Sequence, residues 1–157
     1  MYKPNPLRSD PKKSAEKRIK ASVKKVNDAY SLPKLQAKLW EVFSAFIRAR
    51  DSKDSLFKCI SCNQTKSTRD GNLQAGHYFK SEMYSGIRYN EWNVNGQCKS
   101  CNLYKEGNRQ GYQKGLLRKI GKDKLDMLDN MKNNKSKWGR FEYQILIEEY
   151  KLKLKNL

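Results

Sequence analysis

Acidic residues, histidine and long apolar runs are all scarce in this sequence. Asp and Glu total 16 against 34 Lys and Arg, which gives a formal net charge of +18. A domain this basic repels itself when folded, so its charge indicates a polyanionic partner such as DNA or RNA. The alternatives are a generic basic or ribosome-associated protein and a membrane-surface protein. The membrane alternative is the weaker, because the aromatic residues do not follow one basic amphipathic helix.

The sequence has no apolar run of membrane-spanning length, and its N-terminus lacks the apolar stretch of a signal peptide. We therefore expect a cytoplasmic protein without membrane contact. In a reducing cytoplasm, paired cysteines indicate metal ligands before disulfides. Apolar residues make up only 37% of the 157 residues, which predicts a small core that a bound metal would brace.

The N-terminal third of the chain divides into two segments. Residues 1–32 form a basic arm, with a thin apolar stripe that predicts a helix from about residue 14 to residue 30. Residues 33–54 hold the strongest helical pattern, over about 33–50. Its wide apolar face indicates a helix packed against the core. The positions of that face are Leu35, Leu39, Trp40, Val42, Phe43, Phe46 and Ile47.

The remaining chain divides into a central module and a helical tail. Residues 55–112 hold all four cysteines and the single histidine. Within them we expect strands over about 72–80 and 86–95, and a short helix starting near Ser100. Residues 113–157 show helical spacing of apolar residues, with a break at Gly121.

Two Cys-x-x-Cys motifs, Cys59 to Cys62 and Cys98 to Cys101, frame the central module. Two residues between cysteines let both thiolates of a tight turn face one metal, and two such turns complete the tetrahedral four-sulfur site of structural zinc. The alternative is two redox-active or free thiol pairs. The absence of any spare cysteine favours zinc.

The single histidine, His77, lies between the two cysteine pairs and is not needed as a zinc ligand. A lone histidine is more often structural than catalytic. Asparagines at suggestive spacing favour a catalytic role here, because Asn93 precedes Cys98 by five residues and Asn102 directly follows Cys101.

This order of motifs resembles the zinc-braced HNH, or ββα-metal, endonucleases. It resembles still more closely the NinG, or Rap, recombination proteins of lambda-like phages, over about residues 33–150. The resemblance implies an α+β fold: a small ββα-metal module on a four-cysteine zinc site, flanked by N- and C-terminal helices. The matching stretches are 59–62, 75–78, 87–90, 93–94, 97–102 and 107–108.

The same resemblance implies roles for individual residues. His77 is the general base, Asn93 orients its imidazole through a hydrogen bond, and Asn102 binds a catalytic Mg²⁺ or Mn²⁺. The chain departs from the family pattern at Gly76, where many HNH sites carry an acidic metal ligand. Other candidates for that ligand are Asp70, Glu82, Glu106 and Asn108.

Basic residues interleave with aromatic residues throughout the module. Cations position phosphates, and exposed aromatic rings stack on unpaired bases, so this pattern predicts a DNA-binding surface. Alternatively, the aromatic residues pack the small core around the zinc. The predicted DNA-binding residues are Arg69, Lys80, Arg88, Lys105 and Arg109.

The function expected from these observations is a metal-dependent, structure-specific DNA endonuclease. The resemblance implies branched recombination intermediates, Holliday junctions and D-loops, as substrates in phage recombination in the host cytoplasm. Paired cuts across a junction would favour a homodimer, and recombination proteins are further expected partners. The rival is a non-catalytic zinc-ribbon module that binds DNA or RNA, or serves as a recombination accessory.

Overall fold

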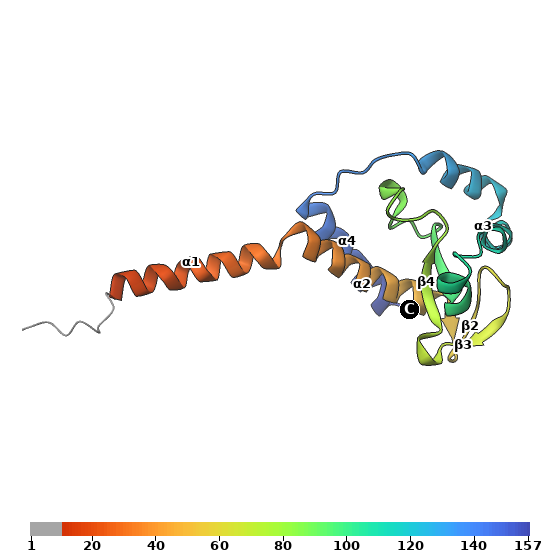
Figure 1. Ribbon diagram of the computed structural model, residues 1–157, viewed down its shortest axis with the longest axis horizontal. Coiled ribbons are helices and arrows are strands. Elements are labelled where there is room, and N and C mark those ends of the chain that lie inside the picture. The colour runs from red at the N-terminus through yellow and green to blue at the C-terminus, as the bar shows by residue number, and fades with distance from the viewer. Residues whose placement is uncertain (1–10) are drawn as a thin grey trace, which may run out of the picture.

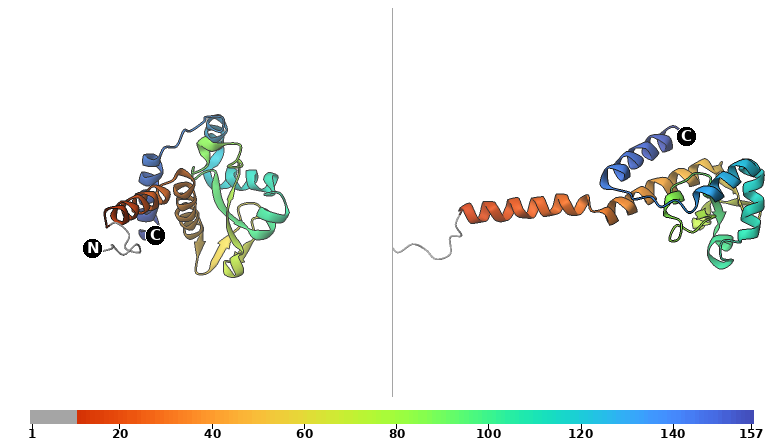
Figure 2. Two further views of the ribbon diagram at one scale, coloured as in Figure 1. Left: turned by 60° about the vertical axis from the view of Figure 1, so that its left-hand side comes forward. Right: turned by 90° about the horizontal axis from the view of Figure 1, so that it is seen from above.

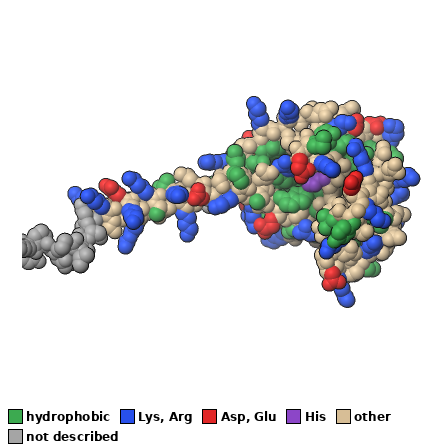
Figure 3. All heavy atoms as spheres, viewed as in Figure 1, with side chains coloured by type: hydrophobic (Ala, Val, Ile, Leu, Met, Phe, Trp, Pro, Cys, Tyr) green, Lys and Arg blue, Asp and Glu red, His purple; other side chains and the backbone are tan. Residues whose placement is uncertain are grey.

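A long basic helix, α1 (Pro11–Ala29), projects away from the rest of the protein (Figures 1 and 2). The computed structural model describes residues 11–157. Lys and Arg side chains are spread along α1 (Figure 3), and its apolar Ile19 and Val23 are exposed. The helix expected near residues 14–30 is confirmed, while residues 1–10 of the predicted arm lie outside the described residues.

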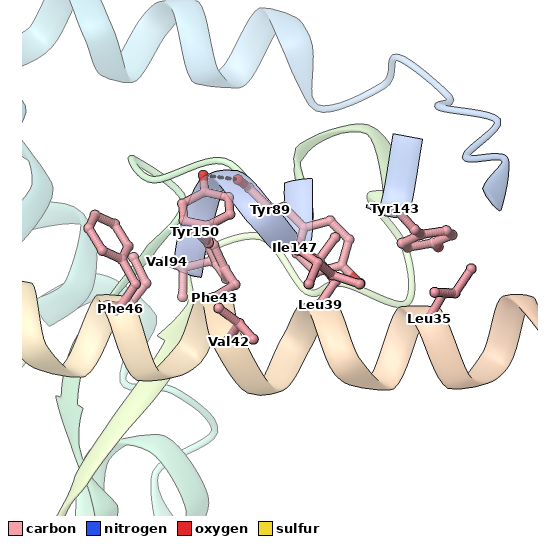
Figure 4. Packing of buried hydrophobic residues seen from close by; sticks show 11 residues of the cluster. Leu35, Leu39, Val42, Phe43, Phe46, Tyr89, Val94, Tyr143, Ile147 and Tyr150 are labelled. Atoms are coloured by element: carbon pink, nitrogen blue, oxygen red, sulfur yellow. Dashed lines mark hydrogen bonds between the residues drawn. The ribbon is translucent and has the colours of Figure 1, made fainter. Parts of the chain in front are cut away.

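The main core lies between helices α2 (Leu32–Arg50) and α4 (Arg140–Lys155), which pack side by side (Figure 4). A proline in the first turn of α2 costs no hydrogen bond, since that turn has no intrahelical acceptor for it. Every apolar residue predicted for this face is buried except Trp40, which is half-buried. The core partners contributed by α4 are Tyr143, Ile147 and Tyr150.

Three short antiparallel strands follow α2, and the turn between the second and the third holds the first cysteine pair. They pair in the order β1, β2, β3, with Phe57 buried at the centre. Their bounds are β1 Ser52–Lys53, β2 Leu56–Lys58 and β3 Thr65–Ser67. The predicted segment 33–54 therefore contains the first strand as well as the helix.

A second, two-stranded sheet carries the candidate site. Strand β4 (Leu73–His77) pairs with β5 (Val94–Cys98) in antiparallel register, so that Leu73 lies opposite Cys98 and His77 opposite Val94. The strand expected within 72–80 is confirmed. The second expected strand, 86–95, is wrong in position, because most of that segment forms turns closed by local hydrogen bonds, including the 3₁₀ turn η2 (Ser85–Ile87).

Short helical turns and a long helix complete the module. A 3₁₀ turn, η1 (Arg69–Gly71), precedes β4, and a π-helical turn, η3 (Ser100–Tyr104), follows β5 where a short helix was expected. Helix α3 (Arg109–Met131) is interrupted at Gly121, whose φ of 79° is accessible to glycine at no steric cost. The predicted boundary at residue 112 is too late, because α3 starts at Arg109.

An ion-paired carboxylate ties three elements together. Asp51, at the end of α2, accepts hydrogen bonds from Gly96 N of β5 at 2.7 Å, Arg50 Nε at 2.8 Å and Lys119 Nζ of α3 at 2.7 Å. Burial alone would raise the pKa of Asp51, but the hydrogen bonds and charges of Arg50 and Lys119 hold it below its ordinary value. The ionised carboxylate therefore holds α3 and β5 against the end of α2.

The described part of the chain is a mixture of helices and short antiparallel strands, which confirms the mixed α and β fold class. None of its helices has the length and apolar character needed to span a bilayer.

Candidate functional site

The four cysteines converge on one point at the base of the second sheet. Cys59 and Cys62 lie in the turn after β2, Cys98 ends β5, and Cys101 lies in η3. All four sulfur atoms lie within 4.8 Å of one another, and the Sγ atoms of Cys62 and Cys98 are 4.0 Å apart. A tetrahedral zinc ion with bonds of about 2.3 Å separates its sulfurs by roughly 3.8 Å. The predicted cluster is confirmed, and it could hold a structural metal such as zinc.

Hydrogen bonds to sulfur support the same conclusion. The backbone N–H of Cys98 donates to Cys59 Sγ at 3.3 Å, and Asn108 Nδ2 donates to Cys101 Sγ at 3.7 Å. Burial would raise the pKa of Cys98, but hydrogen bonds from Cys101 and the neighbouring thiols lower it to about 7. Burial raises the pKa of Cys59 and of Cys101 above the ordinary value, so the hydrogen bonds favour the thiolate most at Cys98. Donors aimed at sulfur favour thiolates, the form that binds metals.

An open cleft of ≈1230 Å³ is lined in part by Asn102, the residue that follows Cys101 of the cysteine cluster. Its walls come from the first half of α2, the end of β4, the loop after β4, the turn η3 and the start of α3. Five residues predicted as site residues line it, namely His77, Lys80, Arg88, Asn102 and Arg109. The fold therefore brings together side chains from segments that are far apart in the sequence.

His77 is held in place from two directions. Its Nε2 lies 2.9 Å from the carbonyl oxygen of Arg88, and its ring stacks on Trp40 of α2 with centroids 5.1 Å apart. A carbonyl oxygen only accepts, so Nε2 carries the proton and Nδ1 is the basic nitrogen. Burial lowers the pKa of His77 below its ordinary value, which keeps the imidazole neutral at neutral pH. The geometry suits a general base.

Asn93 does not have the contact that was expected of it. Within residues 11–157 its side chain makes no hydrogen bond to His77, and it is fully buried. Its Oδ1 accepts from Phe79 N at 2.8 Å, while its Nδ2 donates to the carbonyls of Phe79 and Ile87, each at 3.1 Å. The amide of Asn93 thus closes the loop that carries the Arg88 carbonyl.

Asn102, the predicted metal ligand, lines the cleft from η3. A Cβ atom placed on Gly76 would lie 3.0 Å from Asn102 Oδ1, so the two positions are neighbours. Among the four alternative acidic or amide ligands, Glu82 and Glu106 line the cleft. Asp70 lies in η1, outside the set that lines the cleft, and Asn108 donates to a cysteine sulfur.

The predicted DNA-binding residues separate into two groups. Lys80 and Arg109 are exposed in the cleft, whereas Arg88 is half-buried and donates through Nη2 to Ser81 O at 2.9 Å. Arg69 and Lys105 are exposed and do not line the cleft, so their role in DNA binding stays a prediction. The guanidinium of Arg109 lies over the ring of Tyr78, and this cation–π contact helps to hold the Arg109 side chain in the cleft.

Two residues of the site were missed in the sequence. Trp40 was assigned to the core face of α2, and no local signal indicates that its ring reaches His77. Gln97 falls within a matching stretch but was given no role, although its side chain is fully buried beside Gly76. Both contacts depend on tertiary packing.

Comparison with known proteins decides the family. The family model described as "Bacteriophage Lambda NinG protein" matches residues 6–157. The chain belongs to the NinG family. It is 34% identical over 117 residues to the protein ninG of Escherichia phage lambda, and these residues cover 74% of this chain and 54% of the relative. It is 32% identical over 117 residues to the ninG protein of Salmonella phage P22, and these residues cover 74% of this chain and 54% of that relative.

The NinG resemblance seen in the motifs is therefore confirmed, while the comparisons do not address the HNH assignment. This NinG family chain spans about half the length of the curated relatives that it matches. No solved structure matches it significantly.

Proposed function

We propose that this NinG family protein is a zinc-braced, metal-dependent endonuclease of the HNH type that cuts branched DNA in phage recombination. One observation carries the proposal. His77 and Asn102 line one cleft together with the basic residues Lys80, Arg88 and Arg109, and Asn102 directly follows Cys101 of the four-cysteine cluster. The order of elements, β4, β5 and the short helical turn η3, agrees with a ββα-metal arrangement.

The cysteine cluster would position the two halves of the site. It joins the turn after β2 to the end of β5 and the start of η3. A zinc ion bound there would fix η3, and with it Asn102, relative to β4 and His77. Structural zinc contributes to the folding free energy of small domains.

His77 would act as the general base. Its neutral imidazole lines the cleft with Nδ1 as the basic nitrogen, while the Arg88 carbonyl and the Trp40 ring hold its orientation. Nδ1 takes a proton from the water that attacks phosphorus. A bound Mg²⁺ or Mn²⁺ would stabilise the charge that develops on the phosphate and on the leaving oxygen. Asn93 is a positioning residue, since it braces the loop that carries the Arg88 carbonyl.

The surface favours DNA shape over base sequence. Lys80 and Arg109 in the cleft and the basic helix α1 offer phosphate contacts from separate directions. Tyr104, at the end of η3, is 74% exposed and available for stacking on an unpaired base. DNA whose strands diverge presents several backbones and exposed bases at once, which suits a four-way junction or a D-loop.

The test is an assay of zinc-loaded protein on an end-labelled four-way junction, with and without Mg²⁺. We expect Mg²⁺-dependent nicks near the branch, and weaker cleavage and binding of a linear duplex with the same arm sequences. Tight junction binding with no cleavage under any divalent cation would leave the non-catalytic binding module as the function.

A further inference from the structure

Gly76 occupies the position at which many HNH sites carry an acidic ligand, and the space beside it is filled. A Cβ atom at this glycine would collide with Gln97 Oε1 and would also lie 3.0 Å from Asn102 Oδ1. Gly76 pairs with Asn95 across the sheet, so Gln97, two residues further along β5, is its diagonal neighbour on the same face. An amide oxygen from β5 therefore stands where a side chain of residue 76 would begin.

The amide of Gln97 has a fixed orientation. Its Nε2 donates to Ser61 Oγ at 2.6 Å and to the carbonyl oxygen of Gly107. Ser61 Oγ itself donates to Gly107 O at 3.2 Å, so both groups act as acceptors toward Gln97. Turning the amide over would place Oε1 against a carbonyl oxygen. Oε1 therefore faces Gly76 and Asn102.

This oxygen has an unmet need for a partner. Gln97 is fully buried, and among residues 11–157 its Oε1 has no hydrogen-bond donor. A buried acceptor left unpaired costs about 1–3 kcal/mol, and most buried polar atoms in proteins are satisfied. A cation is one partner that would satisfy it, and Asn102 Oδ1, a second amide oxygen, lies beside the same position.

We propose that Gln97 Oε1 and Asn102 Oδ1 together supply the protein oxygens for the divalent cation, in place of a carboxylate at residue 76. The inference rests on the proposed function for the existence of a cation site here; Asn102 lines the cleft, and Gln97 is buried beside Gly76. Amide oxygens are hard ligands that suit Mg²⁺ and Mn²⁺. Because both are neutral, the free protein binds the cation weakly, and a DNA phosphate supplies the missing negative charge. Cation and DNA then strengthen each other's binding by the same factor.

The experiment measures Mn²⁺ binding to zinc-loaded protein by the electron paramagnetic resonance signal of free Mn²⁺. Gln97→Met keeps the side-chain size and removes the oxygen, so we expect affinity to fall about tenfold or more. The matched control is Gln74→Met, which changes the glutamine paired with Gln97 across the sheet and should leave affinity unchanged. Equal affinity of the Gln97 variant and wild type would overturn the proposal.

A second variant guards against simple loss of folding. Gly76→Asp alone should lower the melting temperature, because its side chain meets Gln97 Oε1. Gly76→Asp/Gln97→Ala vacates that space for a carboxylate, and should bind Mn²⁺ more tightly than wild type. A double variant that folds and binds Mn²⁺ no better than Gln97→Met would contradict the assignment.

The readout separates this inference from the nuclease proposal. Mn²⁺ binding that depends on Gln97 in a protein that cuts no DNA would defeat the proposed function and leave the cation site standing. If Glu82→Ala or Glu106→Ala lowered Mn²⁺ affinity and Gln97→Met did not, while wild type still cut DNA, the cation assignment would be defeated and the nuclease proposal would stand.

Discussion

Replacing Asp51 by Ala should be among the most destabilising changes outside the cysteine cluster. The Asp51 side chain is only 9% exposed, while Arg50 and Lys119, which it neutralises, are 20% and 36% exposed. Its loss leaves the Gly96 N–H without its acceptor and removes the neutralising carboxylate from two partly buried cations. The cations keep oxygen acceptors such as Asn95 Oδ1, to which both donate. Removing one partner of a buried ion pair costs about 3–5 kcal/mol. Since both cations keep some solvent contact, we expect about 3 kcal/mol.

For a domain of this size, about 3 kcal/mol corresponds to a melting temperature lower by roughly 6–12 °C. The assay is thermal unfolding of zinc-loaded protein at pH 7, followed by circular dichroism. The matched control is Asp126→Ala, which breaks the exposed Lys122–Asp126 pair within α3 and should change the melting temperature little. If Asp51→Ala melted together with that control, the claim that this carboxylate joins α2, β5 and α3 would be refuted.

Three further predictions concern the structural zinc, the pH dependence of cleavage and the salt dependence of DNA binding. Cys98→Ser should lose zinc and the fold of residues 55–112, because structural zinc contributes on the order of 10 kcal/mol; elemental analysis that finds no metal in folded wild type would contradict this. Cleavage should be lost as pH falls through the pKa of His77, which lies below the ordinary value of about 6.5; a rate that rises toward acid pH would exclude His77 as the base. A plot of the logarithm of the DNA association constant against the logarithm of salt concentration should have a slope of roughly −4 or steeper, for about five or more phosphate contacts. Removal of residues 1–30 should make this slope shallower without moving the cleavage position, and an unchanged slope in a filter-binding titration would exclude α1 from the interface.

Local patterns in the sequence account for the elements that depend on local chemistry. The apolar stripe of α2 predicts its length and its buried face, because a helix buries residues at a regular spacing. The two Cys-x-x-Cys motifs predict the sulfur cluster, because each pair already places two ligands on one turn. Gly121 predicts the break in α3, because its backbone conformation there is rarely accessible to other residues.

Features that depend on contacts between distant segments could not be predicted in this way. The segment before β5 contains residues typical of strands. Ile87 and Tyr89 are nevertheless buried from a segment of turns and not from a hydrogen-bonded strand. Asn93 was expected at His77 because both lie in one motif, but its amide closes the intervening loop. Gly76 looked like a missing ligand, whereas the structure fills its place with Gln97 from the facing strand.

The central claim, that His77 performs chemistry on DNA, is tested most directly by one comparison. The single-turnover rate of Mg²⁺-dependent junction cleavage is measured for wild type and for His77→Ala at protein concentrations that saturate the DNA. Loss of a general base should lower the rate by roughly 10²–10⁴-fold, with junction affinity nearly unchanged, since a neutral imidazole contributes little to phosphate binding. A His77→Ala protein that cuts the junction as fast as wild type would contradict the account.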